Sequence, residues 1–474
     1  MIRENRQWTI DNKNKSWKII TFVFPLSIVH CLFLKMPNEK TTSLPFELNN
    51  KRTTTGWAFF DWANSAYALV ISAAIFPGYY TANTDENINI AGWQVPSSAL
   101  YSYAVSIAYL IIALLSPTLS GIADFSNRKM LFLKIFTTIG GLSCIALFFF
   151  TGMSTIYIGL IAFILSTAGF AGGLVFYNSY LPDIATEDQY DRVSAKGFVF
   201  GYIGSVILLV INLFIILNPT KVGLPEGSAG AKLGAQLSFV MVGLWWMGFA
   251  QIPFRRLPKD SKDKMPAGVV QRGWAELKNV WALVKSDKNI LRFLIAFLFY
   301  DAGVQTVLFM ASIFASAELK FETSELIILI LILQLVAAVG AWAFSRFSEK
   351  FGNKLSLLVL LVIWIAICVC SFIIASKIQF YLLGGFVGLT MGGIQSMSRS
   401  TYAKLIPSNT KDTASFFSFM DVMDKIAVVA GTFAFGFVNQ MTGNIRYSVL
   451  TLALFFIIGL IIILPVQVKR MNHV

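Results

Sequence analysis

Charge and histidine are the scarcest features of this 474-residue chain. Only 13% of the residues are charged and 56% are hydrophobic, whereas a soluble protein of this length carries about a quarter charged residues. There is too little charge to cover a surface that faces water, so the composition indicates an integral membrane protein. His30 and His473 are the only histidines and lie near the chain ends, which argues against catalysis by the commonest proton shuttle.

Cysteines and nucleotide-binding loops are also scarce. The four cysteines, Cys31, Cys144, Cys368 and Cys370, all fall in apolar stretches. The last two are two positions apart, so on a helix they point about 200° away from each other and cannot clip one metal ion. The sequence contains no GxxxxGK[ST] loop, so ATP-driven pumping is unsupported. We expect no metal site, no cofactor and no enzyme activity.

Long apolar stretches are abundant. A membrane-spanning helix needs about 20 mainly apolar residues, and twelve stretches qualify. They cover residues 57–80, 98–120, 131–151, 154–178, 195–217, 235–253, 290–315, 324–345, 355–376, 380–403, 415–440 and 446–468. Because the connection 254–289 is the long one, it divides the twelve predicted helices six against six.

The basic residues predict the orientation of these helices. If residues 35–56 are cytoplasmic, twenty-one Lys and Arg fall in loops on that side, whereas the other side holds Lys221, Lys232, Lys320, Lys377 and Arg446. Cytoplasmic loops are enriched in Lys and Arg, so both termini are predicted to be cytoplasmic. The net charge of +13 then reflects topology, and we expect no nucleic-acid partner.

The predicted organisation has five parts. They are a cytoplasmic tail (1–55), a first six-helix half (56–253), a central cytoplasmic loop (254–289), a second six-helix half (290–468) and a short cytoplasmic tail (469–474). The short loops suit the lipid bilayer of a bacterial inner membrane, and we expect the protein to be a monomer.

The first 35 residues allow three interpretations. Residues 19–34 are apolar but contain Pro25, and a thirteenth span there would place five basic residues outside, against the charge rule. A signal peptide would lack an obvious cleavage site. Translation that begins at Met36 is the hypothesis that we favour.

The central loop contains a helical pattern. Trp274, Leu277, Trp281 and Val284 recur at helical spacing among charged residues. This pattern predicts an amphipathic helix, either lying on the cytoplasmic membrane face or docked as a linker between the halves.

The two halves repeat each other. The loop after the second stretch reads SGIADFSNRKM (120–130), and the loop after the eighth reads SRFSEKFGNKL (345–355). A shift of 225 residues aligns Asp124 with Glu349. Parallel repeats of six helices place a substrate site between the halves near the bilayer midplane. The predicted fold class is therefore all-α and integral to a membrane, with twelve transmembrane helices in two six-helix pseudo-repeats.

The first of these loops resembles the loop motif of the major facilitator superfamily between helices 2 and 3. Asp124, Arg128 and Lys129 match the motif. Asn127 replaces a usual glycine, but asparagine tolerates the left-handed backbone better than most residues. The resemblance implies that Asp124, Arg128 and Lys129 serve gating, with Asp124 bonding the N–H groups at the start of the eleventh span.

Other segments resemble one branch of that superfamily, the vacuole effluxer-like family, which includes fungal vacuolar amino-acid exporters and bacterial proteins. The segments are DWANSAY (61–67), YNSYLPDIA (177–185), RVSAKGFVFGYIG (192–204) and GGIQSMSRSTYAKLIP (392–407), with the region of Lys425. The resemblance implies a secondary transporter that moves a small polar solute by alternating access, with amino acids as the best guess, export or uptake as its direction, and protons as the coupling partner. A transporter-derived scaffold or sensor is the alternative, and a membrane-embedded lipid-modifying enzyme is the least favoured.

Ionisable residues inside spans mark transport pathways by default. In the first span, Asp61 lies with Asn64, Ser65 and Tyr67. Asp61 is either a proton or cation carrier, or a residue near the cytoplasmic end that only caps the helix. Asp301 aligns with Asp61 at a shift of 240.

Further candidates lie in the second half. Asp301 and Gln305 are one turn apart in the seventh span. The eleventh span carries Asp421, Asp424 and Lys425. These three residues form either a binding or coupling site or a structural group whose charges neutralise one another. Gln395 in the tenth span joins the pathway set. Tyr177, Asn178 and Arg399 are predicted to be gate or inter-half contacts.

Overall fold

The computed structural model describes residues 47–90, 93–261, 268–321 and 323–468. The elements below lie in one compact unit, Leu48–Val474. The three interpretations of the first 35 residues, both histidines, Cys31 and the tail 469–474 lie outside the described residues.

The first half contains six long spans. They are α3 (Lys51–Ala66), which continues through the π-helical η1 (Tyr67–Ile75) into α4 (Phe76–Ala82), then α5 (Ser97–Ser126), α6 (Lys129–Ala146), α7 (Ile156–Ser179), α9 (Tyr190–Leu217) and α10 (Gly227–Arg256). The connections hold short helices, namely η2 (Leu147–Phe149), η3 (Met153–Thr155), α8 (Leu181–Ile184) and η4 (Pro219–Val222). They also hold an antiparallel hairpin that the sequence analysis missed, β1 (Asn87–Ile90) with β2 (Trp93–Pro96), in which Ile88 lies opposite Val95.

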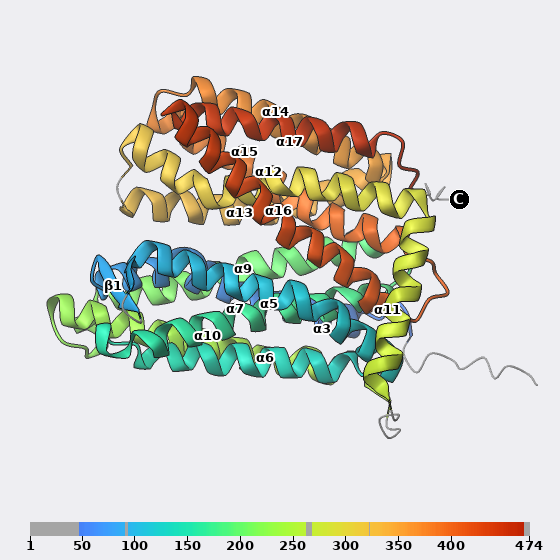
Figure 1. Ribbon diagram of the computed structural model, residues 1–474, viewed down its shortest axis with the longest axis horizontal. Coiled ribbons are helices and arrows are strands. Elements are labelled where there is room, and N and C mark those ends of the chain that lie inside the picture. Colours follow the sequence, from blue (N-terminus) through green and yellow to red (C-terminus); the bar gives the residue numbers. More distant parts are fainter. Residues whose placement is uncertain (1–46, 91–92, 262–267, 322, 469–474) are drawn as a thin grey trace, which may run out of the picture. The chain divides into compact units, whose positions relative to one another are not determined.

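The second half also contains six spans. They are α12 (Lys288–Leu319), α13 (Thr323–Phe351), α14 (Asn353–Ile373), α15 (Lys377–Leu405), α16 (Thr413–Thr442) and α17 (Ile445–Ile463). Figure 1 shows this half, coloured yellow to red, beside the first half, coloured blue to green. Helix α11 (Val269–Ser286) crosses one end of both halves, here called the α11 end, and the opposite end is called the hairpin end.

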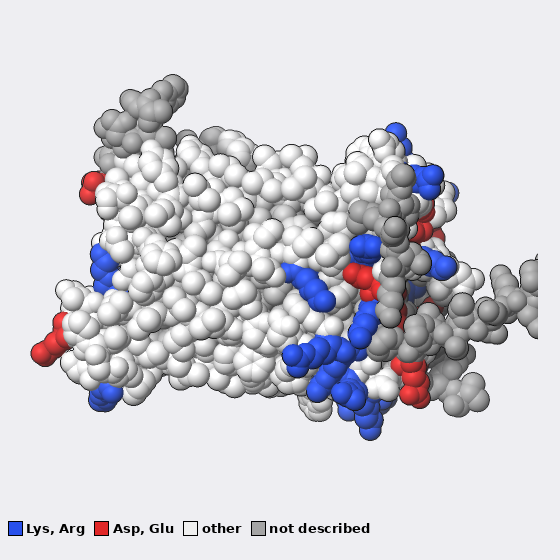
Figure 2. Space-filling view, turned by 90° about the horizontal axis from the view of Figure 1, so that it is seen from below, with Lys and Arg blue, Asp and Glu red and all other residues white. Residues whose placement is uncertain are grey.

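The spans are built to contact lipid. In the described part of the chain, ten helices are long and apolar enough to cross a membrane. Helices α15 and α16 complete the twelve at 29 and 30 residues, but polar side chains lower their apolar character. Large apolar side chains such as Leu114, Ile161 and Phe433 are more than half exposed, as expected where lipid covers them. Figure 2 shows a broad uncharged face, with most charged side chains near the α11 end.

The internal repeat is visible in the backbone. Asn127 ends α5 in the left-handed conformation, with φ 56°. Gly352, which the shift of 225 residues aligns with it, has φ 87°. Positive φ is uncommon outside glycine, so both loops have an unusual backbone at the equivalent position, although only Asn127, with ψ 44°, adopts the left-handed helical conformation, whereas Gly352 has ψ 155°.

The start of the first span corrects the sequence analysis. The helix begins at Lys51, because the Asn50 side chain accepts hydrogen bonds from the backbone N–H groups of Arg52 and Thr53. Asp61 therefore lies ten residues into the helix and is buried, rather than four residues into the span. Hydropathy missed this first segment because its opening turns are polar.

Helix α11 packs on the bundle through one face. A Cβ atom on Gly273 would lie 2.8 Å from the backbone nitrogen of Ile122 in α5, so the two helices touch closely. Leu277 is buried, and the Trp281 ring lies 5.0 Å from that of Phe419 in α16. Partial burial and the neighbouring carboxyl of Asp412 raise the pKa of Glu276 on this helix.

Close packing of α13 on α15 predicts a large effect of one glycine substitution. A Cβ atom at Gly392 would collide with backbone atoms of Ala337, whereas one at Gly385 would meet nothing within 4 Å. Gly392→Val should destabilise the fold by about 1–3 kcal/mol or more, since backbone must shift. Gly385→Val carries the same change of residue without the collision and serves as the control. Equal melting temperatures for the two variants, measured in detergent, would contradict this packing.

Candidate functional site

An ion pair buried between the halves joins Asp61 of α3 to Arg399 of α15. The Arg399 Nη1 atom lies 3.2 Å from Asp61 Oδ2, and the side chains are only 5% and 7% exposed. The Tyr177 hydroxyl donates to the same oxygen at 2.7 Å. The guanidinium also lies over the rings of Trp57 and Phe198, with its carbon 4.7 Å and 4.1 Å from their centroids. Both charges are thus fully enclosed.

Arg399 has further partners in the first half. It donates to the backbone oxygen of Ser194 at 2.8 Å, to Ser194 Oγ at 3.0 Å and to Asn178 Oδ1 at 3.1 Å. Asn178 lies in α7 and Ser194 in α9. One side chain of the second half is therefore bound by three helices of the first.

A second set of contacts joins α9 to the second half. The Asp191 carboxylate accepts hydrogen bonds from Lys404 at 2.8 Å, from Asn353 at 2.7 Å and from Ser348 at 2.7 Å. Arg192 donates to both Glu349 oxygens, at 2.5 Å and 2.7 Å, but its side chain is half exposed. These contacts connect α9 with helices α13, α14 and α15.

Asp124 provides a third connection, at the start of α16. Its carboxylate accepts from the N–H groups of Ala414 at 3.2 Å and Ser415 at 2.7 Å, which is the bonding that the sequence predicted. Lys129 lies 3.9 Å from Asp124, bonds Asp183 at 2.9 Å and also bonds the Thr413 hydroxyl. A carboxylate at a helix start satisfies N–H groups that lack helical partners.

All ion pairs between the halves, among the described residues, lie toward the α11 end. They are Arg399–Asp61, Lys404–Asp191 and Arg192–Glu349, here called the inter-half network. At the hairpin end two ion pairs among the described residues, Lys377–Glu325 and Arg446–Glu318, stay within the second half. The halves are therefore held together by charge at one end.

A separate group of charged side chains lies deeper in the bundle. The Lys425 ammonium is 2.9 Å from Asp421 Oδ1 and 2.6 Å from Asp424 Oδ2. Gln305 of α12 donates to Asp424 at 3.0 Å. Asp301, also on α12, neighbours Asp424 and Lys425. These five residues are here called the carboxylate cluster, and the folded chain brings together the candidates from the seventh and eleventh spans.

The cluster has an unbalanced charge. It holds three carboxylates and one ammonium, and Asp301 is only 5% exposed. Among the described residues, Asp301 Oδ2 has no hydrogen-bond partner. From α5, Ser116 donates to Asp421 at 3.3 Å, and the Tyr109 ring lies 5.5 Å from the Lys425 ammonium. A proton or a donor on a bound solute would satisfy the Asp301 oxygen.

The remaining candidates lie elsewhere. The Tyr67 hydroxyl bonds Thr167 at 2.7 Å within the first half, and Ser65 lies beside Gly201. Asn64 is buried, and neither of its side-chain polar atoms has a partner among the described residues. Of these residues, Ser65 lies on the face of α3 that carries Asp61, since Gly201 of α9 lies against both Ser65 and the Asp61 backbone oxygen.

Two further residues complete the set. Gln395 accepts from Tyr202 at 2.6 Å between the halves. Arg128 precedes α6, and its backbone N–H closes the turn onto Ala123. Within the described residues, no group of three or more His, Cys, Asp or Glu is placed to hold a metal ion.

Sequence reasoning missed several contributors, among them Asp191, Ser116 and Tyr202. Asp191 lies at the start of a helix that follows a polar loop, where a carboxylate is expected to be exposed to solvent. Ser116 precedes Pro117 on α5 and carries no charge to mark it. Pairing each intramembrane charge with every residue at the same depth is the signal that would have suggested them.

Comparison with known proteins places this geometry in context. The family model described as "Vacuole effluxer Atg22 like" matches residues 49–473. The chain is 31% identical over 407 residues to the uncharacterized MFS-type transporter YxiO of Bacillus subtilis (strain 168), covering 86% of this chain and 93% of that protein. It is 25% identical over 504 residues to the autophagy-related protein 22 of Vanderwaltozyma polyspora, covering 90% and 91%. The crystal structure of the major facilitator transporter FucP in the outward conformation has a TM-score of 0.65 at 16% identity, covering 87% and 97%, which shows a shared fold.

Proposed function

Because the chain belongs to the vacuole effluxer Atg22-like family of membrane transporters, we propose that it is a secondary active transporter that works by alternating access and couples solute movement to protons. The observation that carries the proposal is the asymmetry of the inter-half network, whose three ion pairs all lie toward the α11 end. A bundle whose inter-half ion pairs all lie at one end represents one of two access states, the one in which the α11 end is closed.

The α11 end faces the cytoplasm in this proposal. The loops there carry most of the Lys and Arg residues, and cytoplasmic loops are enriched in these residues. In this state the protein is closed to the cytoplasm and open at the hairpin end, on the opposite side of the membrane. The membrane proposed is a bacterial cell membrane, with both termini inside and the protein acting as a monomer.

The carboxylate cluster is the proposed coupling site. Asp301 lies thirteen residues after the start of α12, or about 20 Å along the helix axis, and so near the middle of a bilayer core about 30 Å thick. The unpartnered oxygen beside Asp424 suits a proton shared by two carboxylates. Loss of that proton leaves excess negative charge on the cluster. This charge favours an access state in which water from one side of the membrane reaches the cluster.

Amino acids are the first solute class to test, with export as the proposed direction. The family description as a vacuole effluxer supports this choice. The buried acids and base of the cluster provide partners for an ammonium, which amino acids contain.

Spin-label distances would test the two access states. Two cysteine pairs would carry the labels, one at Arg52 and Asn409 at the α11 end and one at Lys221 and Ala375 at the hairpin end. All four residues are exposed. With Cys31 and Cys370 replaced by serine, we expect each pair to show two distance populations that change in opposite directions with pH or solute. One fixed distance at both ends under all conditions would refute alternating access.

Exchanging Asp421 and Lys425 tests whether the cluster is only a structural ion pair. In the exchanged protein the ammonium faces Ser116 and a carboxylate lies next to Asp424, so we expect a folded protein that has lost solute binding. Exchange of Glu318 and Arg446, which pair at 2.8 Å outside the cluster, is the control. Unchanged binding in the Asp421–Lys425 exchange, measured by calorimetry, would assign the group a structural role.

A further inference from the structure

Two Trp–Lys pairs repeat along α11. The segment WAELK (274–278) is followed after two residues by WALVK (281–285). The pairs are thus seven residues apart, or about two helical turns, which places both of them on the same side of the helix. The Lys278 ammonium lies 5.9 Å from the centroid of the Trp274 ring, and the Lys285 ammonium lies 5.2 Å from that of the Trp281 ring. These four residues are here called the Trp–Lys face.

The contacts of α11 show in which direction the Trp–Lys face points. Figure 1 shows α11 running across the ends of the spans, so its axis follows the membrane surface. On the other flank of the helix, Glu276 interacts with the carboxyl of Asp412, which directly precedes α16. The Trp281 ring instead contacts Phe419, seven residues farther along α16 and about 10 Å deeper into the bundle. The Trp–Lys face therefore points toward the membrane, and the Glu276 flank points toward water.

The Trp–Lys face is exposed and positively charged. Trp274 is 46% exposed, and Val270, one turn before it, is 56% exposed. Lys278 and Lys285 are also exposed, and among the described residues neither ammonium forms an ion pair. Tryptophan rings are enriched at the level of lipid headgroups, and basic amphipathic helices lie in the same layer. Two free ammonium groups at that level attract an anionic headgroup.

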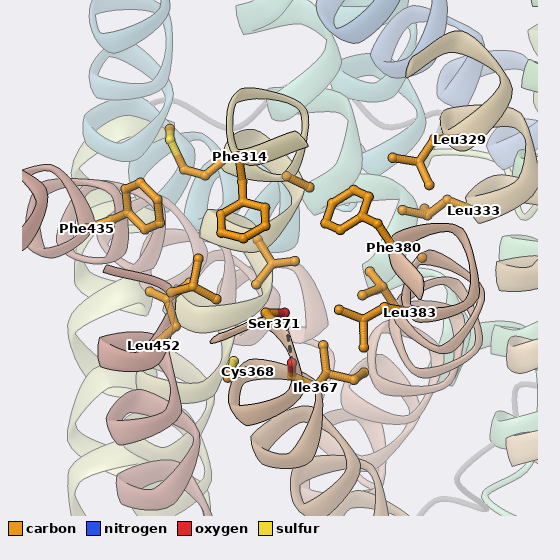
Figure 3. Close-up of a pocket in the computed structure, with 16 residues that line it drawn as sticks. Phe314, Leu329, Leu333, Ile367, Cys368, Ser371, Phe380, Leu383, Phe435 and Leu452 are labelled. Atoms are coloured by element: carbon orange, nitrogen blue, oxygen red, sulfur yellow. Dashed lines mark hydrogen bonds between the residues drawn. The ribbon is translucent and has the colours of Figure 1, made fainter. Parts of the chain in front are cut away.

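The apolar pocket in the second half does not suit such a headgroup. Figure 3 shows the rings of Phe314, Phe380 and Phe435 around it, and none of its described lining residues is charged. The Ser371 hydroxyl in its wall already donates to the backbone oxygen of Ile367 at 2.8 Å. An anion would therefore find no partner in this pocket, in contrast to the Trp–Lys face.

We propose that the Trp–Lys face of α11 binds the headgroups of anionic phospholipids. Lys278 and Lys285 would contact the phosphate oxygens, while the rings of Trp274 and Trp281 lie between the headgroups and the acyl chains. The proposal does not depend on the proposed transport activity, because it requires only that the spans lie in a bilayer. It makes the connection between the halves a lipid-binding element and not merely a linker.

Lipid titrations of the purified full-length protein in detergent test this proposal, with the bound lipids counted by native mass spectrometry. Dioleoylphosphatidylglycerol and dioleoylphosphatidylcholine have the same acyl chains, but only the former has a net negative charge. Because each lysine near an anionic surface contributes about fivefold to binding, we expect phosphatidylglycerol to bind about fivefold tighter or more. Equal binding of the two lipids would overturn the proposal.

A soluble phosphate compound serves as the competitor. At constant ionic strength, sn-glycerol 3-phosphate should not displace phosphatidylglycerol, since it has no acyl chains to lie against the tryptophan rings. Displacement at equal concentration would assign the Trp–Lys face to soluble phosphates and would contradict lipid binding.

Paired lysine variants separate the Trp–Lys face from the other basic residues of the α11 end. Lys278→Gln with Lys285→Gln should weaken phosphatidylglycerol binding about fivefold or more and leave phosphatidylcholine binding unchanged. Lys259→Gln with Lys350→Gln removes two exposed lysines from the same end and is the matched control. Lys278→Arg with Lys285→Arg keeps both charges and should bind as the wild type does. Equal losses in the two glutamine variants would show that the headgroups follow total charge, and the proposal would fail.

A tryptophan variant tests the apolar part of the face. Trp274→Ala should weaken the binding of both lipids by a similar factor, because the ring supplies apolar area and no charge. The melting temperature should not change, since the ring is about half exposed. Unchanged binding of both lipids to this variant would show that the ring does not lie among the lipids and would contradict the proposed orientation of α11.

Discussion

Asp301→Asn abolishes proton-driven solute accumulation while the protein remains folded in the membrane. Asparagine has the shape of aspartate but cannot bind and release a proton. With one proton exchanged per solute, a pH gradient of one unit supports a solute gradient of about tenfold, and the variant should reduce this ratio to about one. The melting temperature should stay the same or rise, because a buried carboxylate that faces Asp424 has been neutralised.

The control for this variant is Glu318→Gln. Glu318 lies on the same helix and pairs with Arg446 outside the carboxylate cluster, so accumulation should persist. Accumulation at the wild-type ratio in reconstituted Asp301→Asn vesicles would remove Asp301 from the coupling mechanism.

Arg399→Gln opens the α11 end of the bundle. The substitution leaves Asp61 buried without its charged partner, and breaking a buried ion pair in this way costs about 3–5 kcal/mol. Because the pair joins the two halves, this cost destabilises the state that is closed at the α11 end. The fraction of molecules open at that end should rise about a hundredfold or more. This rise would be measured as a longer distance between spin labels at positions 52 and 409.

Arg192→Gln is the matched comparison. It also removes an arginine from an ion pair between the halves, but its side chain is half exposed, and exposed pairs contribute about 0–1 kcal/mol. The double variant Arg399→Gln with Asp61→Asn should recover part of the closed population, because no unpaired charge remains. Equal effects of the two arginine substitutions would show that burial of the Asp61–Arg399 pair has no role in closure.

The helices were predictable because lipid imposes a simple rule. Apolar residues must cover about 20 positions per span, and hydropathy records this directly. Hydropathy did not detect the first turns of α3, because these turns are polar and the helix is started by the Asn50 cap rather than by an apolar stretch. The turn at Asn127 was predictable because its backbone conformation restricts the residue type.

The partners of the intramembrane charges were less predictable. Asp61 and Arg399 are 338 positions apart, and the spacing of residues along one helix does not reveal which helices touch. The members of the carboxylate cluster could be proposed one span at a time, because a charge inside a span is itself the signal. Their meeting depends on the packing of α12 on α16, which the sequence does not show.

Proton-coupled flux in reconstituted vesicles is the most direct test of proton-coupled transport by this protein. Vesicles that contain the purified protein would be given a pH gradient, and radiolabelled amino acids would be supplied one at a time. We expect at least one of these solutes to accumulate in a protein-dependent manner, a protonophore to abolish the accumulation, and vesicles with Asp301→Asn not to accumulate the solute. Absence of protein-dependent flux for every solute, or accumulation that survives the protonophore, would refute proton-coupled transport.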